Sequence, residues 1–279
     1  LYRFLIVLAR ILHAFGKWQH LTIPQGSQGG TGMLIRYVCI ATALLIISSD
    51  ALAAGKTVTY QVGGDQFEGF YVSPGYAAPL VLLIHDWDGL TGYEVRRAEM
   101  LAELGYAVFA ADLYGKGIRP TAVSDKRQHT GELYEDRQKM RSLLQGALKA
   151  ADAHGANIHN AVARGYCFGG AAVLELARSG AAMRGYVTFH GGLTTPEGQD
   201  YAAAQGKVLV FHGTADTAVT MDDFAALAVA LEQEDVAHEM ITYGGAPHGF
   251  TVFRTERYRE EADRKSWQRF MAFLEETLR

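Results

Sequence analysis

The sequence predicts one domain of the α/β class, in which helices cover a mostly parallel β-sheet. Short apolar runs typical of strands alternate with longer segments of helical periodicity, and no repeat or low-complexity linker divides residues 54–279. Of the 279 residues 49% are hydrophobic, which is enough for a sizeable core. The net charge is −4, and no basic patch interleaved with aromatic residues indicates a nucleic-acid partner.

The segment before the domain has the pattern of a secretory signal peptide, which we assign to residues 33–53. Met33 and the basic Arg36 are followed by an apolar run over residues 37–47 and by small residues up to Ala53. A membrane-spanning helix requires roughly 20 apolar residues, so we expect no stable membrane span after signal cleavage. An uncleaved N-terminal anchor helix is the alternative.

Residues 1–32 are unusual upstream of a signal peptide, because such a signal normally stands at the N-terminus. We expect translation to start at Met33 and residues 1–32 to be an upstream extension introduced by gene prediction. The mature protein is expected to be exported, to the periplasm. Cleavage after Ala53 leaves Cys167 as its single cysteine, so it has no internal disulfide and depends on its core.

Four strands and one helix are predicted in the first half of the domain. In order, these are strands at residues 57–62, 67–72 and 80–84, a helix at 94–104 and a strand at 106–111. Gly63 and Gly64 form a good hairpin turn between the first two strands. The unbroken apolar run of the third strand is typical of a strand buried on both faces. Gly105 is a natural C-cap for the helix.

The second half alternates helices and strands. In order, these are a helix at residues 133–152, a strand at 158–164, a helix at 171–178, strands at 185–189 and 208–211, a helix at 222–233, a strand at 239–243 and a helix at 256–278. His159 and Asn160 weaken the first of these strands. Gly180 ends the second of these helices. The helix at 222–233 has acidic residues in its first turn, where the helix dipole favours them.

Cys167 lies in the segment between the strand at 158–164 and the helix at 171–178, which has the pattern of a nucleophile elbow. Gly165 and Gly169 flank it, because a nucleophile on a sharp strand-to-helix turn needs neighbours without bulk. We expect the sulfur at the carboxyl edge of the sheet, where the helix dipole lowers the pKa of the thiol. The alternative is a small buried cysteine in a glycine-rich turn.

Asp216 and His248 follow later strands in the order that α/β-hydrolases use, in which nucleophile, acid and histidine succeed one another. Asp216 stands in a turn after the strand at 208–211, and His248 on a Gly/Pro-rich loop after the last strand. We expect His248 to accept the thiol proton and Asp216 to fix its tautomer. Asp222 and Asp223 are competitors for the role of the acid.

The backbone N–H groups of Trp87 and Phe168 are the expected oxyanion hole. One donor usually comes from the loop after the strand at 80–84, and the other from the residue that follows the nucleophile. His85, His190 and His212 also lie at strand ends, but they lack metal-binding spacing and a matching carboxylate set. We therefore expect no metal site.

Five ordered motifs resemble the dienelactone hydrolase family across essentially the whole domain. They occupy residues 84–90, 112–116, 165–170, 212–216 and 247–250. The resemblance implies an α/β-hydrolase fold with a mostly parallel sheet of about eight strands, a Cys–His–Asp triad and no metal or organic cofactor. It implies a cysteine hydrolase that cleaves a small ester, enol ester or lactone through an acyl-enzyme.

Two residues depart from the family pattern. Asp86 stands where the family commonly has a Glu that pairs with the resting cysteine, and its shorter side chain leaves its reach to Cys167 open. Lys116 occupies one of two arginine positions that hold a substrate carboxylate, and Val252 occupies the other. One cation is a poorer clamp than two guanidinium groups, so we expect a substrate other than dienelactone, with Lys116 and Tyr114 among its binding residues.

Two other interpretations of the domain stay open. A catalytically silent α/β-hydrolase domain that serves as a binding module is compatible with the departures from the family. A periplasmic thiol sensor is compatible with a single exposed cysteine. Ester hydrolysis and thiol reactivity separate these functions from the hydrolase.

Overall fold

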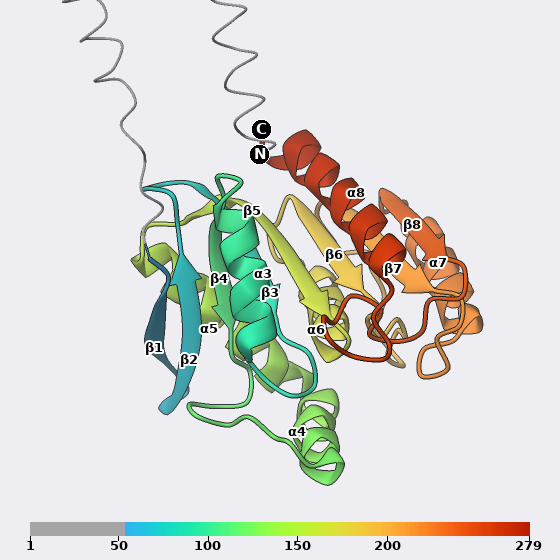
Figure 1. The fold of residues 1–279 in the computed structure, drawn as a ribbon, viewed down its shortest axis with the longest axis horizontal. Coiled ribbons are helices and arrows are strands. Elements are labelled where there is room, and N and C mark those ends of the chain that lie inside the picture. Colours follow the sequence, from blue (N-terminus) through green and yellow to red (C-terminus); the bar gives the residue numbers. More distant parts are fainter. Residues whose placement is uncertain (1–53) are drawn as a thin grey trace, which may run out of the picture. The chain divides into compact units, whose positions relative to one another are not determined.

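An eight-stranded β-sheet forms the centre of residues 54–279, which the computed structural model describes (Figure 1). In chain order the strands are β1 (Lys56–Val62), β2 (Asp65–Val72), β3 (Pro79–Ile84), β4 (Ala107–Ala111), β5 (Asn157–Tyr166), β6 (Gly185–Phe189), β7 (Lys207–Gly213) and β8 (His238–Tyr243). Their spatial order is β1-β2-β4-β3-β5-β6-β7-β8. Only the pairs β1–β2 and β2–β4 are antiparallel, so the prediction of a mostly parallel sheet is confirmed.

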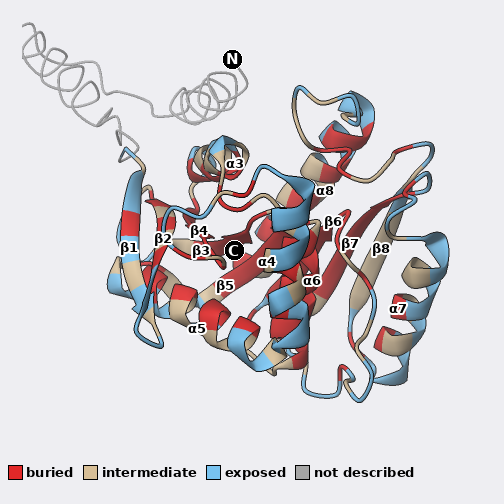
Figure 2. Ribbon diagram, turned by 90° about the horizontal axis from the view of Figure 1, so that it is seen from below, coloured by how far each residue is buried: buried red, intermediate tan, exposed pale blue. Residues whose placement is uncertain are grey.

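Six helices cover the two faces of this described sheet. They are α3 (Gly92–Ala102), α4 (Val123–Glu135), α5 (Arg137–Ala153), α6 (Phe168–Arg178), α7 (Met221–Gln233) and α8 (Glu260–Leu278). On β3, Leu80 and Leu82 belong to the same apolar cluster as buried residues of α4 to α7, whereas Val81 and Leu83 belong to the cluster that includes α3 and α8. Successive strand residues point to opposite faces, so each face has its own apolar core, buried as Figure 2 shows.

The segment predicted as one helix at residues 133–152 belongs to two helices, because the backbone at Asp136 is not helical. This residue has φ −106° and ψ 79°, and its side chain accepts a hydrogen bond from the backbone N–H of Lys139, so it caps α5. The preceding helix α4 was not predicted at its full length. Only Thr130 and Leu133 of α4 are buried, so its sequence lacks the apolar stripe that indicates a helix.

Two other boundaries differ from the predictions. The helix α6 begins directly after Cys167, three residues earlier than predicted, since its glycines mask its first turn. The helix α8 begins at Glu260 instead of residue 256, because residues 249–259 form turns in which the N–H of Arg259 donates to the carbonyl of Phe250. These turns follow His248 and shape one side of the cavity described below.

The predicted upstream extension, residues 1–32, and the predicted signal peptide, residues 33–53, lie outside the described residues. Both assignments therefore stay predictions. Among the helices of residues 54–279, none combines the length and the apolar character that crossing a membrane requires.

Candidate active site

Cys167 lies on a strained turn between β5 and α6. Its φ of 49° and ψ of −111° place a non-glycine residue where side chains are rarely found. The turn closes because its neighbours lack side chains. A Cβ on Gly165 would collide with the carbonyl of Gly169, and one on Gly169 with the carbonyls of Ile84 and His85. The glycine spacing therefore permits the turn that the sequence predicted.

Asp216 and His248 form the predicted acid–histidine pair. The Nδ1 of His248 lies 2.7 Å from the Oδ2 of Asp216, whose other oxygen accepts two hydrogen bonds of 2.9 Å from backbone amides of the next turn. Burial raises the pKa of Asp216, but the hydrogen bonds from His248 and these amides outweigh it and lower the pKa below its usual value. Asp223 instead forms the capping box of α7 with Thr220.

The carboxylate of Asp86 pairs with Cys167. It takes part in a hydrogen bond with the thiol, and its Oδ1 also accepts a hydrogen bond of 2.5 Å from the backbone N–H of Trp87. Burial raises the pKa of the Cys167 thiol well above its usual range, and the charge and hydrogen bond of Asp86 add to the shift. The expectation that the helix dipole lowers this pKa is therefore wrong for the resting site, where a thiol replaces the expected thiolate.

The backbone N–H groups of Trp87 and Phe168 lie near the thiol of Cys167 and line the same cavity. Both act on the thiol as hydrogen-bond donors and oppose the upward shift of its pKa. Phe168 is the first residue of α6, and Trp87 follows β3, so the two donors come from the segments in which the sequence placed them. A pair of amides in this arrangement can hold an oxygen that gains negative charge next to the sulfur.

A cavity of about 380 Å³ joins these groups. Its lining consists of Asp86, Trp87, Tyr134, Cys167, Phe168, Gly192, Thr217, Ala218, Val219, Pro247, His248 and Arg257. The predicted nucleophile, histidine and oxyanion donors therefore share one space. Its volume suits a small molecule, and much of its wall is apolar.

Lys116 does not line this cavity, and its role in substrate binding stays a prediction. It is exposed and borders a separate hollow beside the hairpin of β1 and β2, where its backbone N–H donates to the carbonyl of Gln66. The preceding turn holds it there, because the carboxylate of Asp112 accepts hydrogen bonds from the amides of Tyr114 and Gly115. The motif places a cation at this turn, and in the structure that cation borders this separate hollow.

Tyr114 lies behind the cavity wall and is not part of its lining, so its contact with substrate also stays a prediction. Its hydroxyl donates a hydrogen bond of 3.1 Å to the carbonyl of Trp87, and its ring packs against His85 and Phe168. Tyr114 thus supports the loop that carries one amide donor. Its half-buried ring reaches the hollow of Lys116 and not the lining of the Cys167 cavity.

Tyr134 and Arg257 line the cavity but were not predicted. Tyr134 belongs to α4, whose weak periodicity hid the helix, and its ring packs against Phe168 at 5.6 Å between centroids. Arg257 stands in the turns before α8, a segment that was predicted to be helical. It supplies a cation on the cavity wall, the role that the sequence assigned to Lys116. Only the spatial arrangement of these turns reveals it.

The three strand-end histidines are buried, and burial lowers the pKa of each ring, which favours the neutral form. Burial lowers the pKa of His85 to about 4, and its Nε2 accepts a hydrogen bond from the backbone N–H of Leu113. The Nε2 of His190 lies 2.8 Å from the hydroxyl of Thr251, which anchors the loop after His248. In the described part of the chain, no group of three His, Cys, Asp or Glu residues is arranged to hold a metal ion.

A strained turn that carries a nucleophile, followed along the chain by an acid and a histidine at strand ends, defines an α/β-hydrolase. The chain belongs to the dienelactone hydrolase family, whose sequence model matches residues 67–278. Membership of this family makes it a hydrolase that acts on ester bonds.

Relatives and solved structures agree with this family. A Synechocystis sp. relative, provisionally named a carboxymethylenebutenolidase, is 25% identical over 72% of this chain and 87% of its own length. The structure of a protein called m3DLH is 31% identical, with a TM-score of 0.78, and the match covers 81% of this chain and 99% of that chain. A dienelactone hydrolase-like promiscuous phosphotriesterase from metagenomic libraries is 30% identical over the same shares, with a TM-score of 0.77.

Proposed function

We propose that this chain hydrolyses a small ester, enol ester or lactone through an acyl-enzyme on Cys167. One observation carries the proposal. Cys167, the two residues of the proposed oxyanion hole, Trp87 and Phe168, and His248 all line one cavity of about 380 Å³. The chemistry needs a nucleophile, an oxyanion site and a base in one place, and these residues provide the three.

Acylation begins from the resting thiol. The carbonyl oxygen of the substrate takes the hydrogen bonds of the Trp87 and Phe168 amides and displaces the carboxylate of Asp86 from Trp87. His248 accepts the thiol proton as the sulfur bonds to the carbonyl carbon, and the ionised Asp216 stabilises the imidazolium. The tetrahedral intermediate collapses when the carbon–oxygen bond to the leaving group breaks, and His248 returns the proton to that oxygen.

Deacylation uses the same groups in reverse order. A water molecule attacks the thioester carbon while His248 accepts its proton, and the two amides again hold the oxyanion. The carbon–sulfur bond breaks, the acid leaves, and the sulfur recovers a proton from His248. Asp86 then pairs again with the thiol. No metal or organic cofactor takes part in this proposal.

The pairing with Asp86 favours the hydrolase over the thiol sensor. Redox-sensing cysteines are accessible and have a low pKa, because the thiolate is the form that oxidants attack. The pKa of Cys167 is raised instead, and its side chain is half-buried. A protonated resting thiol is protected from oxidation until a substrate displaces Asp86.

The cavity favours a small, largely apolar substrate that also carries a negative group. Trp87, Phe168 and Val219 supply apolar walls, and Arg257 supplies a cation. A guanidinium binds a carboxylate in a planar, bidentate way. We therefore expect short acyl esters and lactones to react, and a carboxylate on the substrate to lower KM.

Phosphotriester hydrolysis is a second candidate activity, favoured by the 30% identity to a promiscuous phosphotriesterase. The same thiol could attack phosphorus, and the two amides could hold the phosphoryl oxygen as it gains charge. An aryl phosphotriester therefore belongs in the substrate panel beside the esters.

The experiment compares Cys167→Ala with Ser142→Ala on short p-nitrophenyl esters, lactones and an aryl phosphotriester. The control removes one side-chain atom at a partly exposed site of α5 that is not part of the cavity lining. We expect the first variant to lose at least about 10³-fold in kcat, as nucleophile removal does in related triads, and the control to match the parent. Mass spectrometry of the parent should find the acyl group on Cys167.

Undiminished turnover by Cys167→Ala would reject this nucleophile. A parent protein that turns over no compound of the panel, and whose thiol resists alkylation, would instead support the silent binding domain.

A further inference from the structure

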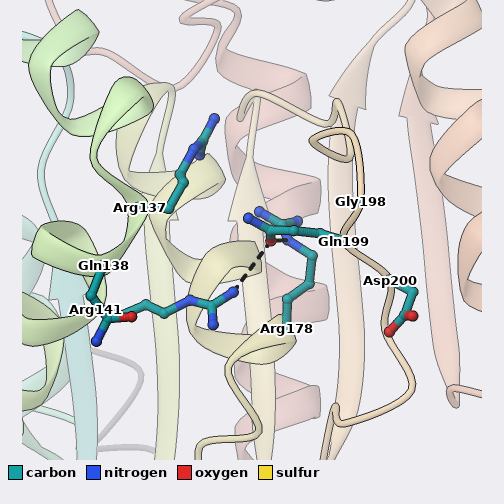
Figure 3. A pocket seen from close by; sticks show the side chains of 7 residues that line it. All are labelled: Arg137, Gln138, Arg141, Arg178, Gly198, Gln199 and Asp200. Carbon is teal, nitrogen blue, oxygen red and sulfur yellow. Dashed lines mark hydrogen bonds between the residues drawn. The ribbon is translucent and has the colours of Figure 1, made fainter.

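A second cavity, of about 470 Å³, lies between α5, the end of α6 and the loop before β7 (Figure 3). Arg137 and Arg141 enter it from α5 and Arg178 from α6. None of these residues lines the cavity of Cys167, so this pocket is separate from the candidate active site. We refer to it as the arginine pocket.

The arginine pocket holds more positive than negative charge. The buried carboxylate of Glu175 accepts hydrogen bonds of 2.7 Å from Arg141 and from Arg178. Arg137 lies 3.6 Å from the same carboxylate. Asp200 also borders the pocket, but within residues 54–279 no ion pair joins it to an arginine. Three guanidinium groups therefore share one carboxylate.

Two of the guanidinium groups are fixed before any ligand arrives. The side-chain oxygen of Gln199 accepts hydrogen bonds from Arg178 at 2.8 Å and from Arg141 at 3.3 Å, and Figure 3 shows the two arginines meeting there. The hydroxyl of Tyr201 accepts a third hydrogen bond from Arg178. Ordering these long side chains in advance removes an entropic cost from ligand binding.

Arg137 is the cation whose donors are unused. Among the described residues its guanidinium makes no hydrogen bond, although only 24% of its side chain is exposed. It packs over the ring of Tyr134 at 4.8 Å. Burial lowers the pKa of Arg137, and the like charges of Arg178 and Arg141 lower it further. The carboxylate of Glu175 opposes this shift. A partly buried cation in this position is stabilised by an anion that accepts its hydrogen bonds.

We propose that the arginine pocket binds a small oxyanion of phosphate-like geometry, held by Arg137 with Arg141 and Arg178. Guanidinium forks match the oxygen spacing of phosphate and carboxylate groups, and Arg137 offers unused donors toward them. The volume exceeds that of one phosphate group, so the pocket can take a small phosphate ester as well as the free ion. The site adjoins the candidate active site through Tyr134, which contacts Arg137 and lines the cavity of Cys167.

The test titrates the purified protein with inorganic phosphate in a calorimeter, with sodium chloride keeping the ionic strength constant. We expect saturable one-to-one binding. Arg137→Gln should weaken phosphate binding about tenfold, since it removes a charge-assisted contact. Arg137→Lys should lose less, because it keeps the charge but not the fork. Arg264→Gln, an exposed site on α8 outside the pocket, should match the parent.

Asp200→Asn provides a test of the opposite sign. It removes an exposed negative charge at the pocket rim, so phosphate should bind about threefold more tightly. Absence of saturation up to about 10 mM phosphate, or an equal loss in Arg137→Gln and Arg264→Gln, would overturn the proposal. Unchanged or weaker binding by the Asp200 variant would also count against it.

Discussion

Burial, together with the carboxylate of Asp86, favours the protonated form of Cys167. The carboxylate shares a hydrogen bond with the thiol and also accepts one from the amide of Trp87, so in the resting site it occupies part of the proposed oxyanion hole. A thiolate formed beside this carboxylate would meet a like charge in a buried place, which raises the pKa of the thiol. Asp86 therefore keeps the site protonated until a substrate competes for the same donors.

Asp86→Asn should lower the pKa of Cys167, because the like charge disappears while a hydrogen-bond acceptor remains. The fraction of thiolate at neutral pH should then rise. The measurement is the rate of alkylation by iodoacetamide as a function of pH. The control, Asp88→Asn, removes the same charge from the same loop. A midpoint that does not move in Asp86→Asn would show that burial alone raises the pKa.

The first turn of α3 holds the loop that carries Asp86 and Trp87. Glu94 is fully buried there, and its carboxylate accepts hydrogen bonds of 2.8 Å from the N–H and the hydroxyl of Thr91, in a capping box, and a longer one from the N–H of Asp86. Burial raises the pKa of Glu94 to about 7, and the charge of Asp86 contributes, although the hydrogen bonds from Thr91 oppose the shift. The same carboxylate thus caps the helix and positions the loop of the active site.

Glu94→Gln should stabilise the protein at alkaline pH relative to acid pH. Between the unfolded pKa of about 4.5 and the folded pKa of about 7, the folded state holds a proton that the unfolded state has lost, so stability falls as pH rises. Glutamine keeps the acceptor but does not ionise. The free energy of unfolding of the variant, relative to that of the parent, should therefore rise by about 3 kcal/mol from about pH 4 to pH 8.

Urea unfolding at the two pH values measures this shift. Glu99→Gln, on the same helix and partly exposed, is the matched control and should show no comparable change. A pH-independent difference for Glu94→Gln would contradict the raised pKa.

The parallel sheet brings together residues that are far apart in the sequence. β3, β5, β7 and β8 are parallel through their neighbours, so their carboxyl ends meet at one edge, and Asp86, Cys167, Asp216 and His248 follow these ends. Ligands of open α/β sheets bind at this edge. β1 begins at Lys56, directly after the predicted cleavage site, so a cleaved chain keeps every described strand.

We propose that the protein is exported with a mature N-terminus at Ala54. Mass spectrometry of the periplasmic fraction should find peptides that begin at this residue. Ala53→Asp should block processing, because signal peptidase sites require small residues. A native peptide from residues 1–32 would refute the proposed start at Met33.

The predictions that succeeded depend on local rules. The unbroken apolar run of β3 identified a buried central strand, and the glycines around Cys167 identified a turn that only residues without side chains allow. The prediction that failed concerns α4, and the predicted substrate-binding residues Lys116 and Tyr114 lie outside the lining of the Cys167 cavity. A helix with two buried residues has no apolar stripe that the sequence pattern could indicate. The cavity that a side chain borders after a tight turn depends on the rest of the fold.

The amino-acid pattern was sufficient for the α/β architecture, the order of strands along the chain and the placement of Cys167, Asp216 and His248 after strand ends. The spacing of apolar residues, the residue types in turns and the order of motifs along the chain are properties of the sequence itself. The pairing of Asp86 with the thiol, the cation of Arg257 on the cavity wall and the shared carboxylate of the arginine pocket required the folded chain. Protonation and charge balance depend on distances between segments, and those distances exist only after the segments have packed together.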